Sequence, residues 1–169
     1  MPLIWIVGVA YNNDAIDPIG YGTKKDIESL KIGSVSDVRA LATYIIEGDL
    51  SEQDVKRICE ELLVDNQIQH YSYCEVGEGD YLKRLVKGED LSNAWIVEVR
   101  FLPGVMDAVG LSTKQAIEVL GIKTISGVRT ATTYIIKGDI GKETLETICK
   151  KLLFNSLIQS YKCVKVGGV

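Results

Sequence analysis

The sequence has little of what catalytic, membrane and nucleic-acid-binding proteins depend on. Its 169 residues include a single histidine, and acidic side chains outnumber basic ones by 23 to 19. A net charge of −4 leaves no surplus of cations to neutralise a phosphate backbone, so we expect no nucleic-acid partner. The longest apolar runs, such as residues 3–10, are far shorter than the ~20 residues that cross a bilayer. Because no basic-then-apolar leader is visible either, we expect a cytoplasmic protein with no membrane partner.

What the sequence does contain is an internal repeat. A shift of 90 residues places Trp5 on Trp95, Tyr44 on Tyr134 and the pair 58–59 on 148–149, with no insertion anywhere. About thirty of some seventy-three aligned positions are identical, which is more than shared composition produces. We therefore divide the chain into a first repeat (1–77), a linker rich in charge and glycine (78–93) and a second repeat (94–169). Residues 81–86 of the linker have a short amphipathic pattern that fits a turn or two of helix.

Each repeat has the same order of hydrophobic periodicities, which predicts strand, helix, strand, helix, strand. In the first repeat, residues 3–11 are apolar on both alternating sets, as in a strand buried on both faces. Thr23 is expected to open the first helix, and residues 38–46 form the β-branched second strand. Ser51 caps a second helix whose apolar stripe includes Cys59, and residues 68–76 form the last strand.

The element pattern predicts an α+β fold of two ferredoxin-like β-α-β-α-β repeats. Two helices cover only one face of a three-stranded sheet, so an apolar face of the first strand would remain in water. A unit of about 75 residues is also close to the size at which a single core is marginal. We therefore expect the open apolar faces of the two repeats to cover each other in a pseudo-twofold dimer within one chain.

Candidate catalytic and metal-binding residues are few. His70 aligns with Ser160, so the chain cannot build a histidine pair or a histidine-rich metal cluster. No cysteines are spaced as Cys-x-x-Cys, and Cys59 and Cys149 lie on apolar helix stripes, where a free cysteine usually packs as a small hydrophobe. A glycine pair near residue 20 lacks the remaining glycines and the lysine of a phosphate-binding loop. We expect reduced thiols, no metal, no cofactor and no catalytic residues.

The loop between the first strand and first helix carries a more specific pattern. In the second repeat, residues 101–110 read Phe-Leu-Pro-Gly-Val-Met-Asp-Ala-Val-Gly, and the following strand contains Val128-Arg129. This loop resembles the one after the first strand of the PurS proteins, the small subunits of phosphoribosylformylglycinamidine (FGAM) synthase. The likeness continues through residues 148–153 and 155–161. The first repeat keeps Asp17, Pro18 and Gly20 of the loop and Val38-Arg39 of the strand, although Asn13-Asp14 replaces proline-glycine.

The resemblance implies a non-catalytic subunit of an ATP-dependent C–N ligase of purine biosynthesis that uses glutamine as its amide donor. In that family a large subunit activates the substrate amide with ATP, a glutaminase subunit releases ammonia, and the small subunit helps to join them. The implied partners are these two subunits, with further self-association also possible. The implied partner-facing residues are Asp17, Pro18, Gly20, Arg39, Pro103, Gly104, Asp107, Gly110 and Arg129.

Two interpretations from other classes stay open. A tandem regulatory module would bind a small ligand in a polar seam between its repeats, whereas the scaffold interpretation predicts a dry, apolar seam. A free-standing enzyme would need a nucleophile with its base or a metal cluster, and the sequence supplies neither.

Overall fold

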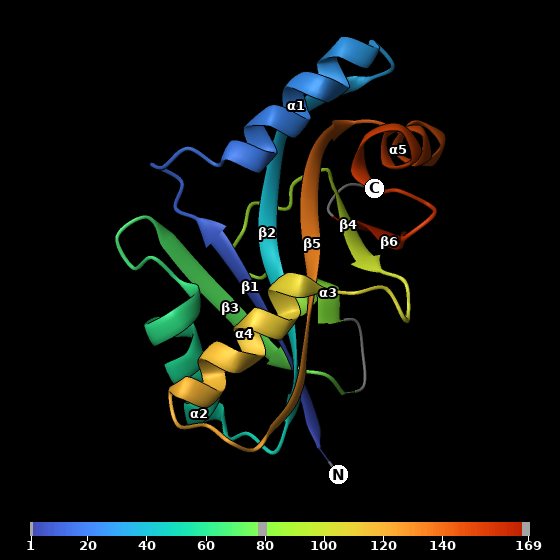
Figure 1. The fold of residues 1–169 in the computed structure, drawn as a ribbon. Coiled ribbons are helices and arrows are strands. Elements are labelled where there is room, and N and C mark those ends of the chain that lie inside the picture. Colours follow the sequence, from blue (N-terminus) through green and yellow to red (C-terminus); the bar gives the residue numbers. More distant parts are fainter. Residues whose placement is uncertain (1, 78–80, 167–169) are drawn as a thin grey trace. The chain divides into compact units, whose positions relative to one another are not determined.

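The computed structural model describes residues 2–77 and 81–166. The first repeat forms β1 (Leu3–Tyr11), α1 (Pro18–Leu30), β2 (Ser34–Gly48), α2 (Glu52–Ile58) with a π-helical turn η1 (Cys59–Leu63), and β3 (Gln69–Glu75). A short helix, α3 (Tyr81–Leu85), follows. The second repeat forms β4 (Ala94–Phe101), α4 (Ala108–Val119), β5 (Ile125–Asp139), α5 (Lys142–Ile148) with the π-helical turn η2 (Cys149–Leu153), and β6 (Gln159–Val166). The predicted order of elements is thus confirmed in both repeats (Figure 1).

The start of the first helix differs from its expected position. Helix α1 begins at Pro18, with Asp17 as its N-cap, rather than at Thr23. The fixed φ of proline suits the first helical turn, and an aspartate before it accepts an otherwise unpaired backbone N–H. The cap predicted at Ser51 is confirmed, because its hydroxyl accepts from Asp54 N while the Asp54 carboxylate accepts from Ser51 N.

The six strands form one antiparallel sheet, in the order β3-β1-β2-β5-β4-β6. In β1, Val7 lies opposite Tyr44 of β2 and Tyr73 of β3. In β4, Val97 lies opposite Cys163 of β6. The α+β class with two β-α-β-α-β repeats is therefore confirmed.

The chain has two compact units, and these do not coincide with the sequence repeats. Unit 1 contains residues 1–15, 42–88 and 106–131, and unit 2 contains residues 16–41, 89–105 and 132–169. Unit 1 thus holds β1, α2 and β3 of the first repeat together with α4 of the second. Unit 2 holds β4, α5 and β6 of the second repeat together with α1 of the first. Each unit takes one of its helices from the other repeat.

The core of unit 1 shows what this exchange provides. Ile117 of α4 is fully buried against Val7 and Val9 of β1 and against Val55 and Ile58 of α2. Ile122, Ile125 and Val128, which follow α4 in the chain, belong to the same cluster. Burying apolar surface of this kind is the main favourable contribution to folding, so α4 is part of the unit 1 core.

Unit 2 has the equivalent core with the roles of the repeats reversed. Ile27 of α1 is fully buried with Val97 of β4 and with Leu145 and Ile148 of α5. Ile27 and Ile117 occupy the same position of the repeat, 90 residues apart. The same side chain therefore fills the same place in each core.

The second face of the unit 1 sheet is covered differently from our expectation. Leu85 of α3 packs against Ile6 of β1, Ile45 of β2 and Cys74 of β3. The Ser72 hydroxyl donates to the carbonyl oxygen of Leu85 at 2.5 Å, which ties α3 to β3. The expected cover, an open sheet face of the other repeat, is thus wrong for this part of unit 1. Residues 81–86, which we expected to belong to the linker, contribute a short helix whose apolar side chains, Leu82 and Leu85, are buried.

Candidate functional site

Asp17 fixes the loop that the resemblance marks as partner-facing in the first repeat. Its carboxylate accepts from Gly20 N at 2.9 Å and from Ala40 N of β2 at 2.8 Å, and the residue is buried. The first bond caps α1, and the second ties the start of the helix to the strand beside Arg39. A loop held at both ends in this way presents its outer residues in a defined position.

Asp107 repeats this arrangement in the second repeat. Its carboxylate accepts from Gly110 N at 2.8 Å and from both the backbone N–H and the hydroxyl of Thr130 in β5. Asp107 and Thr130 lie 90 residues after Asp17 and Ala40. The structure therefore brings Asp17 together with Gly20, and Asp107 with Gly110, as structural caps.

Replacing Asp17 by alanine should destabilise the protein by about 2–4 kcal/mol. The change removes an N-cap, which typically contributes about 0.5–2 kcal/mol, and leaves the buried Ala40 N–H without its acceptor, which costs about 1–3 kcal/mol. Denaturant unfolding followed by circular dichroism measures the loss. Asp14→Ala, at an exposed position of the same loop, is the matched control and should change stability by less than about 0.5 kcal/mol. Equal effects of the two substitutions would contradict the capping role.

The remaining predicted partner-facing residues have varied surroundings. Pro18, Pro103 and Gly104 are exposed, and Gly104 has a φ of +84° in the turn after β4. Arg129 is exposed on β5. The Arg39 guanidinium is largely buried, with its Nε atom 3.5 Å from a carboxylate oxygen of Glu89.

An exposed apolar triplet lies beside each of these caps, and neither was among the residues predicted from the sequence. The triplets are Ile16, Ile19 and Tyr21 at the start of α1, and Met106, Val109 and Leu111 at the start of α4. All six residues are between 50% and 77% exposed. The triplets are matched at the 90-residue offset, and unit 2 holds the first while unit 1 holds the second. The available signal was the repetition of apolar residues outside any helix stripe.

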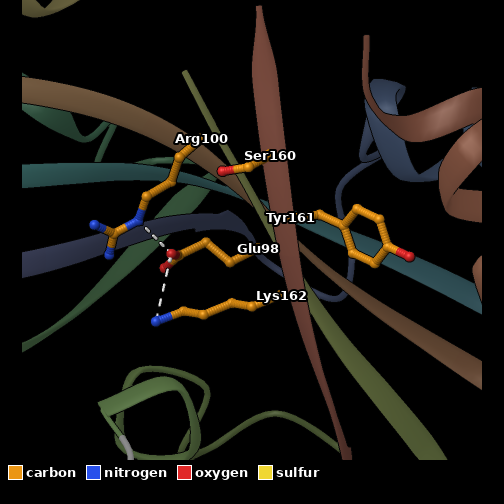
Figure 2. A pocket seen from close by; sticks show the side chains of 5 residues that line it. All are labelled: Glu98, Arg100, Ser160, Tyr161 and Lys162. Atoms are coloured by element: carbon orange, nitrogen blue, oxygen red, sulfur yellow. Dashed lines mark hydrogen bonds and ion pairs between the residues drawn. The ribbon is translucent and has the colours of Figure 1, made fainter. Parts of the chain in front are cut away.

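A polar pocket in unit 2 was also overlooked. Glu98 of β4 lies opposite Lys162 of β6, and Arg100 lies two residues further along β4 on the same face. Figure 2 shows the Glu98 carboxylate between the other two side chains: it contacts Arg100 Nε, and Lys162 Nζ lies 3.9 Å from it. Ser160 and Tyr161 complete the lining of a cavity of about 160 Å³.

The chemistry of this pocket centres on a buried charge. Glu98 is 1% exposed, and a buried carboxylate is tolerated only when it is paired. Arg100 and Lys162 supply that pairing, so the lining carries two cations and one anion. The aligned residues of the first repeat are Gly8, Ala10 and Ser72, and the two charged residues Glu98 and Arg100 inside a strand whose counterpart in the first repeat is uncharged were the signal in the sequence.

Two cysteines, Cys59 and Cys149, lie in the hydrophobic cores, as predicted. Cys59 and Cys149 are fully buried, and burial raises the pKa of each thiol to about 12. A nucleophile or metal ligand needs the thiolate, which these thiols do not form near neutral pH. Among the described residues, no three histidine, cysteine or acidic side chains are grouped so as to hold a metal ion. His70 is exposed, with Nδ1 2.9 Å from Asn12 Oδ1.

Comparison with known families assigns the chain. The PurS model, described as phosphoribosylformylglycinamidine (FGAM) synthase, matches twice, over residues 5–76 and 94–166. The chain belongs to the PurS family. The double match confirms both the predicted resemblance and the tandem duplication. No curated protein matches the sequence.

PurS membership connects the chain with FGAM synthase and purine biosynthesis. Each match includes all five elements of a β-α-β-α-β repeat, apart from the first two residues of β1, so the chain contains two PurS modules joined by the segment that carries α3. Among the helices that the structure describes, none has the length and apolar character needed to traverse a lipid bilayer.

Proposed function

We propose that this chain is the non-catalytic small subunit of an FGAM synthase complex and joins the ATP-dependent large subunit to the glutaminase subunit. The family match supports membership of such a complex. The joining role is supported by the two apolar triplets described above, because exposed clusters of large apolar side chains are characteristic of protein interaction sites.

The observation that carries the proposal is that the triplets are matched in position but differ in composition. Ile19 and Tyr21 of one correspond to Val109 and Leu111 of the other. A duplicated contact surface with diverged side chains fits two different partner surfaces, since specificity follows from side-chain shape and polarity. The structural caps at Asp17 and Asp107 hold both surfaces in place before any partner binds, which lowers the entropic cost of binding.

The direct experiment mixes this chain with the large synthase subunit and the glutaminase of the same pathway. Mass photometry should show a particle that contains all three proteins, and leaving out this chain should remove that particle. A particle of the large subunit and glutaminase that forms equally well without this chain would contradict the joining role.

Polar substitutions in either triplet should weaken the assembly without unfolding the chain. The test variants are Ile19→Ser/Tyr21→Ser and Val109→Ser/Leu111→Ser. Burial of each apolar side chain contributes about 1.5–3 kcal/mol, so each double variant should lower partner affinity by at least about tenfold. The control is Val119→Ser, an exposed apolar position on α4 outside the triplet, which should leave affinity within about twofold. Unchanged binding by both double variants, with unchanged melting temperatures, would exclude the triplets as contacts.

One observation favours a second candidate function, binding of a small ligand, namely the polar pocket around Glu98 in unit 2. This pocket lies within the second repeat, not in the seam between repeats where the small-ligand alternative placed its ligand. A thermal-shift series against purine nucleotides and amino acids tests it. Binding there should raise the melting temperature in proportion to ligand concentration, and Lys162→Ala should abolish the rise. If no compound raises the melting temperature, the alternative is excluded for these ligands.

A further inference from the structure

The two repeats carry opposite net charge. Residues 1–77 contain thirteen acidic and six basic side chains, a net charge of −7. Residues 94–169 contain six acidic and ten basic side chains, a net charge of +4. Both repeats build the same elements, so the fold does not require this difference. A charge asymmetry between halves of a chain points to its interactions.

The reversal of charge between the repeats is concentrated on one surface, which lies at the equivalent place in each repeat. Three glutamates on α2–η1 have lysines at the aligned positions of α5–η2, and all six side chains are exposed. We call the first surface the acidic face (Glu52, Glu60 and Glu61) and the second the basic face (Lys142, Lys150 and Lys151). The twelve residues 52–63 carry a net charge of −2, and the twelve residues 142–153 carry +1.

The two faces are built on the same backbone. Each consists of a seven-residue α-helix followed by a five-residue π-helical turn, with bounds that differ by 90 residues. The side chains beneath them are also equivalent, since Ile58 and Cys59 of one match Ile148 and Cys149 of the other and all four are fully buried. The faces therefore share a backbone shape and differ in the sign of their charge.

The acidic face is fixed by contacts within unit 1. The hydroxyl of Tyr71 donates to Glu60 and that of Tyr73 to Glu52, both at 2.7 Å. Arg57 Nε lies 3.0 Å from a carboxylate oxygen of Glu61. These bonds hold the carboxylates in defined positions. Preorganised charges favour association because less side-chain entropy is lost on docking.

The lysines of the basic face are not held by ion pairs in this way. Within the described part of the chain, none of the three forms a salt bridge. They belong to unit 2, whereas the three glutamates belong to unit 1, and all six side chains are exposed to solvent in the folded chain. The basic face is thus available to carboxylates from outside the chain.

We infer that a second copy of this chain docks its acidic face on the basic face of the first. When two equivalent surfaces pair around a twofold axis, the same set of positions on each surface forms the contact. Identical repeats would set glutamate against glutamate, which is repulsive. In the tandem chain, a first repeat paired with a second repeat places Glu60 and Glu61 opposite the positions of Lys150 and Lys151. Reversal at several positions of one face is the pattern that such pairing requires.

The interaction should depend strongly on salt. A single exposed ion pair contributes only about 0–1 kcal/mol, and such pairs are screened within about 10 Å at 0.1 M ionic strength. Several pairs acting across one contact favour association at low salt and supply its specificity. This inference stands independently of the proposed synthase role, because it concerns the chain alone.

Sedimentation velocity at 20 and 500 mM NaCl, over a range of protein concentrations, tests the inference. The unmodified chain should show a weight-average mass above its monomer mass of 18.6 kDa at low salt, and this mass should fall toward 18.6 kDa at high salt. A weight-average mass of 18.6 kDa for the unmodified chain at every concentration of the low-salt series would overturn the inference.

Charge-reversal pairs make the test specific. The variants are Glu60→Lys/Glu61→Lys and Lys150→Glu/Lys151→Glu. Each alone should lower the association constant by at least about tenfold, and an equimolar mixture of the two should associate again, because one variant has two basic faces and the other two acidic faces. Failure of the mixture to associate, with both variants folded, would contradict docking between these faces.

A matched control separates local docking from general charge repulsion. Lys83→Glu/Lys87→Glu changes the net charge by the same amount as Lys150→Glu/Lys151→Glu, at exposed positions outside both faces. It should leave the association constant within about twofold. Glu60 and Glu61 also form bonds within unit 1, so the Glu60→Lys/Glu61→Lys variant could fail to fold for that reason alone. In that case the Lys150→Glu/Lys151→Glu variant alone decides the test. An equal decrease of the association constant in the control and in Lys150→Glu/Lys151→Glu would contradict the inference.

Discussion

Residues 1–77, expressed alone, should not form a folded monomer. This segment contains β1, α2 and β3 of unit 1 but lacks α4 and the start of β5. Its core would lose Ile117, Ile122, Ile125 and Val128. Each large apolar side chain removed from a core costs about 2–5 kcal/mol, so the combined loss of about 8–20 kcal/mol is as large as the 5–15 kcal/mol by which most domains are stable.

The isolated segment has one way to recover this core. Its own α1 carries Ile27, the equivalent of Ile117, and Ile32 follows at the position of Ile122. Two copies can therefore exchange α1 helices and complete each other's cores, as the repeats do within one chain. The melting temperature should then rise with protein concentration, whereas that of the full chain should not.

Light scattering and thermal melts at several concentrations check this expectation. The full-length chain is the control, because its second repeat supplies α4 in the same molecule. A folded monomer of residues 1–77 with a concentration-independent melting temperature would contradict the exchange of helices between repeats.

Alanine substitutions at two glycines of α1 should change stability in opposite directions. A Cβ atom at Gly20 would lie 2.4 Å from the carbonyl oxygen of Val38 and 2.6 Å from the Asp17 carboxylate. The carbonyl belongs to the backbone of β2 and the carboxylate holds the helix cap, so neither moves without breaking other bonds. Gly20→Ala should therefore destabilise the protein by about 1–3 kcal/mol or more.

Gly22, two residues later in the same helix, is the matched comparison. A Cβ atom there would meet nothing within 4 Å. Alanine at a helical position without steric conflict is favoured over glycine by about 0.5–1 kcal/mol, so Gly22→Ala should stabilise the protein. Denaturant unfolding of both variants measures the difference. A Gly20→Ala variant as stable as Gly22→Ala would show that α1 does not approach β2 this closely.

Local features were predictable because they depend on neighbouring residues. The apolar run of β1, the stripe that includes Cys59 and the cap at Ser51 are read from spacing alone. The duplication repeats the first two, whereas Gly141 stands at the position that corresponds to Ser51. The start of α1 was placed too late because Asp17 and Pro18 were assigned to a loop. The pair is in fact a helix-start signal, an N-cap residue followed by proline.

Features that depend on distant residues were not predictable in the same way. Ile27 and Ile117 occupy the same position of identical stripes, so periodicity does not tell which repeat each helix packs against. The role of α3 was missed because a helix of five residues gives a weak pattern, although Leu85 is buried. Glu98 and Arg100 are the charged residues of β4, but the pocket also needs Lys162, which is 64 residues from Glu98 in the sequence.

The most direct test of the proposed function compares two nitrogen sources in the same assay. The large subunit and the glutaminase are combined with FGAR, the formylglycinamide ribonucleotide substrate, and with ATP, with and without this chain. Formation of FGAM is measured with glutamine or with ammonia. We expect the chain to increase glutamine-dependent synthesis greatly and to leave ammonia-dependent synthesis within about twofold, because it joins the two enzymes and adds no catalytic group. Glutamine-dependent synthesis at the same rate without the chain would contradict this expectation.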